Sequence, residues 1–204
     1  MKLKKLTTEL AQGITEAGFD TDPKDVQSTG IPKIKSGADL FIISPEKSGK
    51  STTIAIGVIQ LLKTAFEEAP RALIMVANKE KAFEMEESIQ LLGKHTDLRS
   101  FVVFDQGVIQ YQKDMIYEGI DILIGTPKRL VELMNISGFP MTRIKSFIVD
   151  DADTLVQQGA NHAIMRIGDS IPKSQLIIIS ERWNSKFDSL SERIMKNPQI
   201  IKTK

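Results

Sequence analysis

One segment, Phe41-Ile-Ile-Ser-Pro-Glu-Lys-Ser-Gly-Lys-Ser51, constrains the fold of this chain more than any other. The apolar run Leu40–Ile43 predicts a buried strand, a short polar loop follows it, and a helical pattern begins at Thr52. Backbone N–H groups in such a loop converge at a helix N-terminus, where the helix dipole favours negative charge. The segment therefore predicts a phosphate-binding loop.

The side chains of this loop add to the prediction. Lys50 would supply a cation for the outer phosphates, and the hydroxyl of Ser51 would ligate Mg²⁺. Ser44 stands where the GxxxxGK[ST] pattern has its first glycine, so a chance Gly-Lys-Ser at a helix start is the alternative. The strand before the loop and the helix after it favour phosphate binding. The predicted nucleotide-binding residues of the loop are Pro45, Glu46, Lys47, Ser48, Gly49, Lys50, Ser51 and Thr52.

Short apolar runs alternate with helical patterns through the rest of the chain, which predicts βαβ units. Runs that are apolar throughout indicate strands buried on both faces, as in a parallel sheet. We therefore expect a doubly wound α/β domain with a mainly parallel sheet and helices on both faces. The expected strands are 40–43, 72–76, 101–104, 120–124, 147–149, 176–179 and 200–201; the expected helices are 3–17, 52–68, 79–92, 108–117, one from 127, 160–170 and one between the last two strands. Residues 19–27 are expected to form a polar turn, and Ile31–Ile34 to lead through Gly37 into the first strand.

Bulk composition excludes several classes of protein. The net charge of the 204 residues is +1, so any nucleic-acid contact must depend on local patches. The chain has no cysteine, which excludes disulfides and thiolate metal sites and fits a reducing compartment. No apolar stretch approaches the ~18 residues of a membrane span. We expect a cytoplasmic protein without membrane contact, and a monomer.

A second candidate site follows the predicted strand 147–149, in the sequence Asp150-Asp151-Ala152-Asp153. In an open α/β sheet, ligands bind outside the carboxyl ends of the strands, where the phosphate loop also lies. A phosphate site needs one acid for Mg²⁺ and another to orient the attacking water, which predicts Asp150 as metal partner and Asp151 as base. The alternative is an acidic helix start, because aspartate is a preferred N-cap.

The motifs taken together resemble the first RecA-like domain of DEAD-box RNA helicases, from about Gly18 to the C-terminus. The order and spacing of the motifs carry this resemblance. The adenine-sensing Q motif is resembled by Gly18-Phe19 and Pro23-Lys-Asp-Val-Gln27, and the phosphate loop by Ser44–Ser51. The Pro-Thr-Arg-Glu-Leu-Ala element is resembled by Ala77–Ala82, the Gly-Gly element by Asp105-Gln-Gly107, and the Thr-Pro-Gly-Arg element by Thr126-Pro-Lys-Arg129. The Asp-Glu-Ala-Asp signature is resembled by Asp150–Asp153, and the Ser-Ala-Thr element by Ser180-Glu-Arg182.

The resemblance implies a function and a set of site residues. It implies an ATP- and Mg²⁺-binding lobe, with residues 1–38 as N-terminal helix and Q-motif region and 39–204 as core. It also implies sequence-independent contacts to the RNA backbone, and a second RecA-like lobe, in cis or in trans, that this sequence does not contain. The implied residues are Lys50, Asp150 and Asp151 for catalysis; Gln27 and the loop 45–52 for nucleotide; Ser51 and Asp150 for metal; Asn78, Lys79, Gly107, Thr126, Pro127 and Arg129 for RNA; and Asp153, Ser180 and Arg182 for coupling.

The Thr-Pro element also has a physical interpretation of its own. Thr126 would cap a helix that Pro127 starts, which presents free N–H groups to a phosphate, and Arg129 would add a planar cation. An ordinary capped helix with a solvated arginine is the alternative reading of the same residues.

Three departures from the family pattern bear on activity. Lys47 replaces a loop glycine, Asp151 replaces a glutamate and retracts its carboxylate by one methylene, and Glu181 with Arg182 brings charge to the coupling element. The leading hypothesis is an ATPase lobe of an RNA helicase that is weak or inactive by itself. A second hypothesis is a catalytically decayed module that binds RNA or protein without nucleotide, and a third is a small phosphate-loop kinase or nucleotidase.

Overall fold

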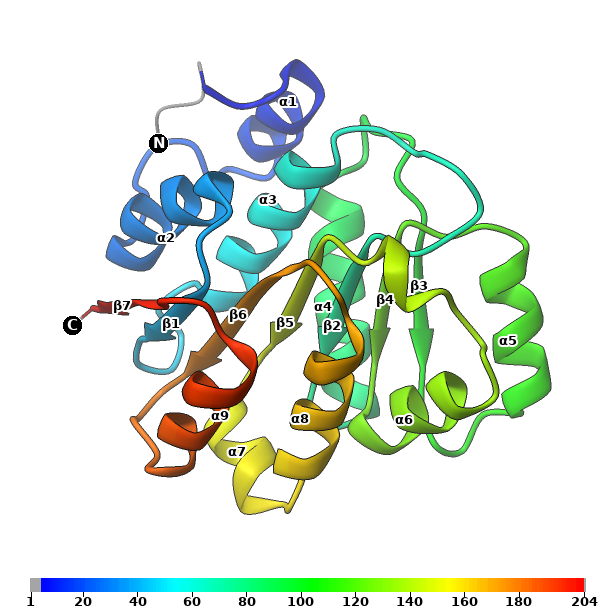
Figure 1. The fold of residues 1–204 in the computed structure, drawn as a ribbon. Helices are drawn as coiled ribbons and strands as arrows, with labels where there is room; N and C mark the ends of the chain where they lie inside the picture. Colours follow the sequence, from blue (N-terminus) through cyan, green and yellow to red (C-terminus); the bar gives the residue numbers. More distant parts are fainter. Residues whose placement is uncertain (1–4, 204) are drawn as a thin grey trace.

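The computed structural model describes residues 5–203, and within them it has one parallel sheet between two layers of helices (Figure 1). The strand order is β3-β4-β2-β5-β6-β1-β7, and every neighbouring pair is parallel. The predicted doubly wound α/β fold is confirmed. The strands are β1 Leu40–Ile43, β2 Ala72–Met75, β3 Ser100–Val103, β4 Ile122–Gly125, β5 Ser146–Val149, β6 Gln175–Ser180 and β7 Gln199–Lys202.

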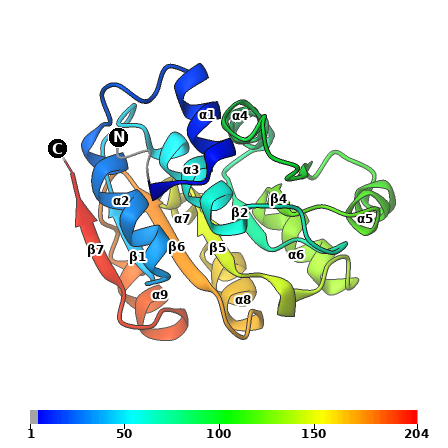
Figure 2. The ribbon, with the colours of Figure 1, turned by 90° about the horizontal axis from the view of Figure 1, so that it is seen from above.

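The helices cover both faces of the sheet, so apolar strands find a partner on either side (Figure 2). Helices α1 to α4 pack on one face, and α6, α8 and α9 pack on the other. None of the helices in residues 5–203 is long and apolar enough to cross a lipid bilayer. The helices are α1 Thr8–Glu16, α2 Asp25–Ser36, α3 Lys50–Leu62, α4 Lys79–Leu92, α5 Ile109–Tyr117, α6 Pro127–Asn135, α7 Ala152–Gln157, α8 Asn161–Ser170 and α9 Lys186–Ile194, with a 3₁₀ turn η2 at Met141–Arg143.

Helix α2 corrects the predicted turn and lead-in at residues 19–37. An internal proline normally disrupts a helix, yet Pro32 lies inside α2. The helix is held by its packing on α3, where Ile34 fits against Gly57; a Cβ at Gly57 would lie 2.9 Å from the Ile34 side chain. Tertiary packing therefore outweighs the local propensity here.

Two helix boundaries also differ from the prediction. Helix α3 ends at Leu62 instead of residue 68, because Lys63 turns the chain with a φ of 67° and the N–H of Phe66 donates to Asp121. Helix α1 begins at Thr8, later than predicted; residues 3 and 4 of the predicted span 3–17 lie outside the described residues.

The amino ends of β2, β3 and β4 are joined by a buried ion-pair cluster around Asp121. The Asp121 carboxylate is fully buried and accepts from Arg71 Nη2 at 2.5 Å and from Arg99 Nε at 2.9 Å. Burial alone would raise the pKa of Asp121, but the hydrogen bonds from Arg99 and Arg71 outweigh it and lower the pKa below its usual value. These ion pairs therefore hold together the amino ends of the three strands, at the opposite end of the sheet from the predicted phosphate loop.

Replacing Asp121 by Asn should destabilise the chain by about 3–5 kcal/mol, because two arginines lose their buried counter-charge. A group with a lowered folded pKa stabilises above its unfolded pKa, so wild-type stability should fall as the pH drops through the acid range, and less steeply in Asp121→Asn. Urea unfolding over a pH series measures both effects. Asp169→Asn removes a half-exposed partner of Arg193 and should cost less than about 1 kcal/mol. Equal losses in the two variants would contradict the prediction.

Candidate functional site: the carboxyl ends of the strands

The predicted phosphate loop, residues 44–49, connects β1 to α3 at the carboxyl edge of the sheet. Gly49 precedes α3 with a φ of 96°, in the left-handed region that glycine adopts without strain. Lys47 has a φ of 58°, so the residue that replaces a loop glycine holds a glycine-like conformation. The Ser44 hydroxyl donates to Ser48 Oγ at 2.7 Å and contacts Thr203 Oγ1 at 2.6 Å, which joins the loop to the end of β7.

The first turn of α2 packs against this loop. Lys24 Nζ donates to the Lys47 carbonyl, and Gln27 Oε1 accepts from Lys24 N at 2.9 Å. The buried Gln27 amide lies so close to the loop that a Cβ on Gly49 would be 3.0 Å from Gln27 Nε2. A cavity of about 700 Å³ begins beside Gln27; it is lined by Lys5, Leu6, Pro23, Gln27, Ser28, Ile31, Pro32 and Lys35.

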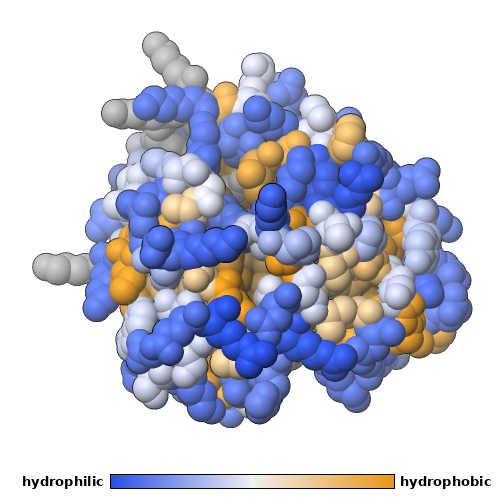
Figure 3. All heavy atoms as spheres, viewed as in Figure 1, coloured by the Kyte–Doolittle hydropathy of each residue, from blue (hydrophilic) through white to orange (hydrophobic). Residues whose placement is uncertain are grey.

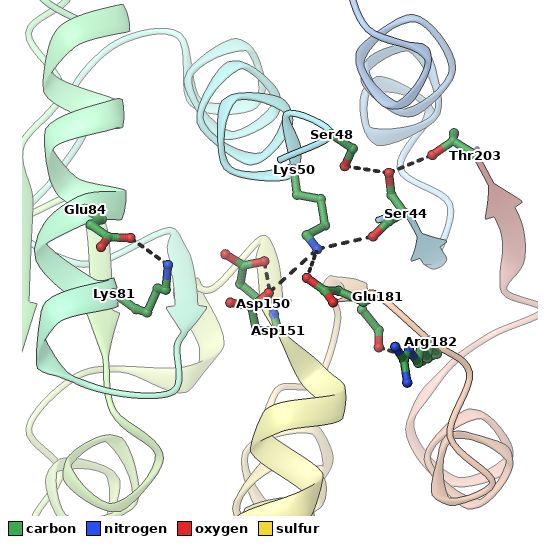
Figure 4. Close-up of polar contacts among 11 residues, drawn as sticks. Ser44, Ser48, Lys50, Lys81, Glu84, Asp150, Asp151, Glu181, Arg182 and Thr203 are labelled. Carbon is green, nitrogen blue, oxygen red and sulfur yellow. Dashed lines mark hydrogen bonds and ion pairs between the residues drawn. The ribbon is translucent and has the colours of Figure 1, made fainter. Parts of the chain in front are cut away.

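Lys50 is the centre of the site, as Figure 4 shows. Its side chain is 8% exposed, and its ammonium donates to the Ser44 carbonyl and to Glu181 Oε1, each at 3.2 Å. Asp151 Oδ1 lies 3.9 Å from the same nitrogen. The ends of β1, β5 and β6 therefore bring residues together that are up to 131 positions apart in sequence.

The two aspartates after β5 occupy different environments. Burial, reinforced by the charge of Asp151, raises the pKa of Asp150 to about 7. Burial also raises the pKa of Asp151, whose backbone is left-handed with a φ of 48° and which precedes α7. Asp150 Oδ1 accepts from the N–H of Asp151 at 3.0 Å. Neither carboxyl group thus has a full complement of positive charge around it.

The donor set suits a hard divalent cation. Mg²⁺ prefers carboxylate and hydroxyl oxygens and usually retains several waters. Ser51 lies exposed at the first turn of α3, and the raised pKa of Asp150 indicates a carboxylate whose ionised form needs a cation. Ser51 and Asp150, the predicted metal residues, therefore carry oxygen donors of the kind that Mg²⁺ prefers.

A hydrogen bond joins two of the three predicted coupling residues, Ser180 and Arg182. The hydroxyl of Ser180 is buried and donates to the Arg182 carbonyl at 2.7 Å, while the Ser180 carbonyl accepts from Ser44 N at 3.0 Å. Asp153 Oδ1 is a buried oxygen to which no hydrogen bond is made within the described part of the chain. Ser180 thus connects the phosphate loop to the loop after β6.

A groove of about 890 Å³ lies beside the phosphate site, at the carboxyl ends of β2, β3 and β4. Asn78 and Lys79 line it at the start of α4, where Asn78 Oδ1 caps the helix by accepting from Lys81 N. The Lys79 ammonium lies 4.6 Å from the centre of the Phe104 ring. The opposite wall includes Thr126 and Pro127. Figure 3, viewed as in Figure 1, shows a largely hydrophilic surface with hydrophobic residues in separate patches.

The structure corrects the interpretation of the Thr-Pro element in two details. Thr126 occupies the N-cap position of α6, but its hydroxyl donates to Asp105 Oδ1 at 2.7 Å and not to the helix. Arg129 is 4% exposed, and its guanidinium donates to the carbonyls of Asp105 and Gly107. It also donates to the side chains of Gln112 and Glu132. Arg129 therefore lies beneath the loop 105–107 and holds it, instead of facing solvent.

Comparison with known proteins places this arrangement in a family. The model of the DEAD/DEAH box helicase domain matches residues 24–181, which include the phosphate loop, the Asp150–Asp153 sequence and Glu181. The chain belongs to this family. The resemblance inferred from the motifs is confirmed.

Two of its curated relatives are RNA helicases by name. The chain is 27% identical over 201 residues to the ATP-dependent RNA helicase eIF4A of Kluyveromyces lactis, covering 98% of the chain and 50% of that protein. It is 25% identical to the ATP-dependent RNA helicase DbpA of Bacillus subtilis, covering 98% of the chain and 42% of the relative. The chain thus spans about half the length of the curated relatives that it matches.

A solved structure confirms the fold independently of sequence. The crystal structure of a DEAD box protein from the hyperthermophile Methanococcus jannaschii superposes with a TM-score of 0.91 at 22% identity. The superposition covers 98% of this chain and 54% of that one. The RecA-like arrangement of the sheet and helices is therefore shared with a DEAD-box domain.

Two contacts of the site were outside the reach of sequence reasoning. The salt bridge between Lys50 and Glu181 was not predicted, although the charge at position 181 was noted as unusual. The contact of Lys24 with the loop carbonyl was also missed, because α2 itself was not predicted. Pairing of β1 with β6 is the signal that would have brought residue 181 to the phosphate loop.

The raised pKa of Asp150 gives a testable pH dependence for the metal-free chain. Between the ordinary value of 3.8 and about 7, the folded state retains a proton that the unfolded state has lost. Stability should therefore fall as the pH rises through this window and become constant above it. Asp150→Asn should flatten the profile and stabilise the chain at about pH 8 by a few kcal/mol, at ~1.4 kcal/mol for each pKa unit.

Urea unfolding in the presence of a chelator, at about pH 5 and about pH 8, measures this slope. The control Asp169→Asn, on the exposed surface of α8, should keep the wild-type slope. A slope that is the same in Asp150→Asn would show that another group titrates.

Proposed function

We propose that this chain is the ATP- and RNA-binding N-terminal lobe of a divergent DEAD-box ATP-dependent RNA helicase. One observation carries the proposal: a buried lysine after a loop and a pair of aspartates after β5 meet at the carboxyl edge of the sheet, within 3.9 Å at Lys50 and Asp151. This is the pairing of cation and acids that phosphoryl transfer requires. Residues 1–204 then form a single lobe, and a second RecA-like lobe in cis or in trans would complete the enzyme.

In this proposal each residue of the loop has a definite task. The N–H groups at the start of α3 and the Lys50 ammonium bind the β- and γ-phosphates, while the remaining loop residues 45–49 and Thr52 surround them. Gln27 lies at the mouth of the 700 Å³ cavity, where its amide would read the nucleobase. Ser51 and Asp150 would hold Mg²⁺, which supplies charge neutralisation for the phosphates when bound.

Asp151 is the candidate general base. A base must reach the proton that it abstracts within about 3 Å, or through one water. Its carboxylate is one methylene shorter than the family's glutamate, and an error of about 1 Å can cost ~100-fold in rate. We therefore expect hydrolysis to be slow even with a second lobe present, and weak or absent in this chain by itself.

RNA would bind along the 890 Å³ groove through its backbone. Asn78, Lys79, Thr126 and Pro127 line the groove, so their polar groups and the N-terminus of α6 would contact phosphates without reading bases. A Cβ at Gly107 would lie 2.0 Å from Gln112 Nε2, so a side chain there would displace the Gln112 amide. We propose that Arg129 acts here as a positioning residue that fixes the loop at Gly107.

A second candidate function remains a decayed module that binds RNA or protein without nucleotide. Lys47 in a left-handed conformation and Glu181 on the Lys50 ammonium are the observations that favour it. The two proposals differ in whether RNA affinity responds to nucleotide.

Calorimetric titration of Mg·ADP and Mg·ATP into this chain tests the nucleotide site. We expect micromolar binding, about 8 kcal/mol, and a loss of at least about tenfold in Lys50→Ala, because the phosphates lose their buried cation. The control Lys173→Ala removes an exposed lysine before β6, at the opposite edge of the sheet, and should bind as wild type. Unchanged affinity in Lys50→Ala would overturn the proposed nucleotide site.

Fluorescence anisotropy with a labelled single-stranded RNA tests the groove. Lys79→Ala should weaken binding roughly 3- to 10-fold and reduce the salt slope by about 0.7, as expected when one phosphate contact is lost. Lys173→Ala again serves as control and should leave the slope unchanged. Affinity that rises with Mg·ATP supports the helicase lobe, whereas nucleotide-independent RNA affinity favours the decayed module.

A further inference from the structure

Glu181 reaches into the phosphate site from the end of β6. Its carboxylate lies 3.2 Å from Lys50 Nζ, closer than Asp151 at 3.9 Å. A carboxylate oxygen and a phosphate oxygen are equivalent acceptors for an ammonium group. Glu181 therefore occupies a position at Lys50 that a phosphate oxygen of the nucleotide would take.

The side of the ammonium that Glu181 occupies indicates which phosphate it replaces. Lys50 contacts the Ser44 carbonyl on the side of the loop, and Glu181 and Asp151 on the side of the acids (Figure 4). In a phosphate loop the β-phosphate is enclosed by the loop itself, while the γ-phosphate extends past it toward the metal and the base. Glu181 thus lies on the side of Lys50 from which a γ-phosphate would approach.

Electrostatic repulsion adds to this competition between Glu181 and a phosphate oxygen for Lys50. Lys50 already faces the carboxyl groups of Asp150, Asp151 and Glu181. The γ-phosphate would bring further negative charge next to them, and like charges at a few ångströms in a partly buried site cost several-fold in affinity. The Glu181 side chain is 36% exposed, so it has space to rotate into solvent and release Lys50.

We propose that Glu181 acts as an internal substitute for the γ-phosphate and makes this site prefer a nucleoside diphosphate over a triphosphate. The inference rests on the proposed nucleotide site and adds its specificity. When a diphosphate is bound, Glu181 and the β-phosphate both contact the Lys50 ammonium. Glu181 keeps its present contact, and the β-phosphate binds the ammonium on the side that faces the phosphate loop. A triphosphate must first displace Glu181.

The test compares Kd for Mg·ADP and Mg·ATP in wild type, Glu181→Gln and Glu181→Ala, by calorimetry. Wild type should bind Mg·ADP more tightly. Glu181→Gln should tighten Mg·ATP by about tenfold and Mg·ADP by about threefold or less, since only the negative charge is lost. Glu181→Ala introduces the alanine of the Ser-Ala-Thr pattern and should have the same effect. Agreement between the two variants would show that the effect is not a local defect caused by glutamine.

The matched control is Glu192→Gln, which removes the same charge from the exposed face of α9 and should leave both Kd values unchanged. If wild type binds both nucleotides and the Kd ratio is the same in the Glu181 variants, the inference is overturned while the proposed function stands. If only the Glu181 variants bind nucleotide, Glu181 blocks the site to both nucleotides, so the diphosphate preference is overturned while the proposed nucleotide site stands. If no variant binds, both the inference and the proposed function are overturned.

Discussion

The buried ammonium of Lys50 is the interaction around which the carboxyl edge of the sheet is built, because three strand ends direct groups toward it. The opposite edge has the reverse arrangement, with the Asp121 carboxylate between Arg71 and Arg99. There the buried charge is fully matched, and the cluster serves stability. At Lys50 one cation faces several carboxyl groups. Burial, reinforced by the charge of Asp151, raises the pKa of Asp150, and the excess of carboxylate oxygens suits Mg²⁺.

Sequence patterns predicted the elements whose apolar faces are unambiguous. The strand Leu40–Ile43 and the helix Lys79–Leu92 agree with the structure to the residue, because an apolar run and a 3.6-residue period define them. The family membership was equally accessible, since it depends on the order of short motifs and not on any single one. The carboxyl-edge position of Lys50 and Asp150 followed from the parallel topology that the alternating pattern implied.

The remaining features depend on contacts between distant residues. Helix α2 continues across Pro32 because Ile34 packs against Gly57 of α3, where a larger residue would clash. The local sequence of α2 gives no information about this contact. Arg129 was expected at the surface, but four acceptors on its own α6, on α5 and on the loop 105–107 bury it. The charge at position 181 is visible in the sequence as a departure from the family pattern. The salt bridge between Glu181 and Lys50 is not, because it depends on the pairing of β1 with β6.

The strand order has an evolutionary consequence. Because β6 separates β1 from β5, any side chain directly after β6 lies between the phosphate loop and the acids. A single-base change converts a glutamate codon into an alanine codon, so one mutation at position 181 can add or remove a carboxylate at the centre of the site without altering the core. Position 181 can therefore change the charge beside Lys50 separately from folding, because it lies between the two halves of the site.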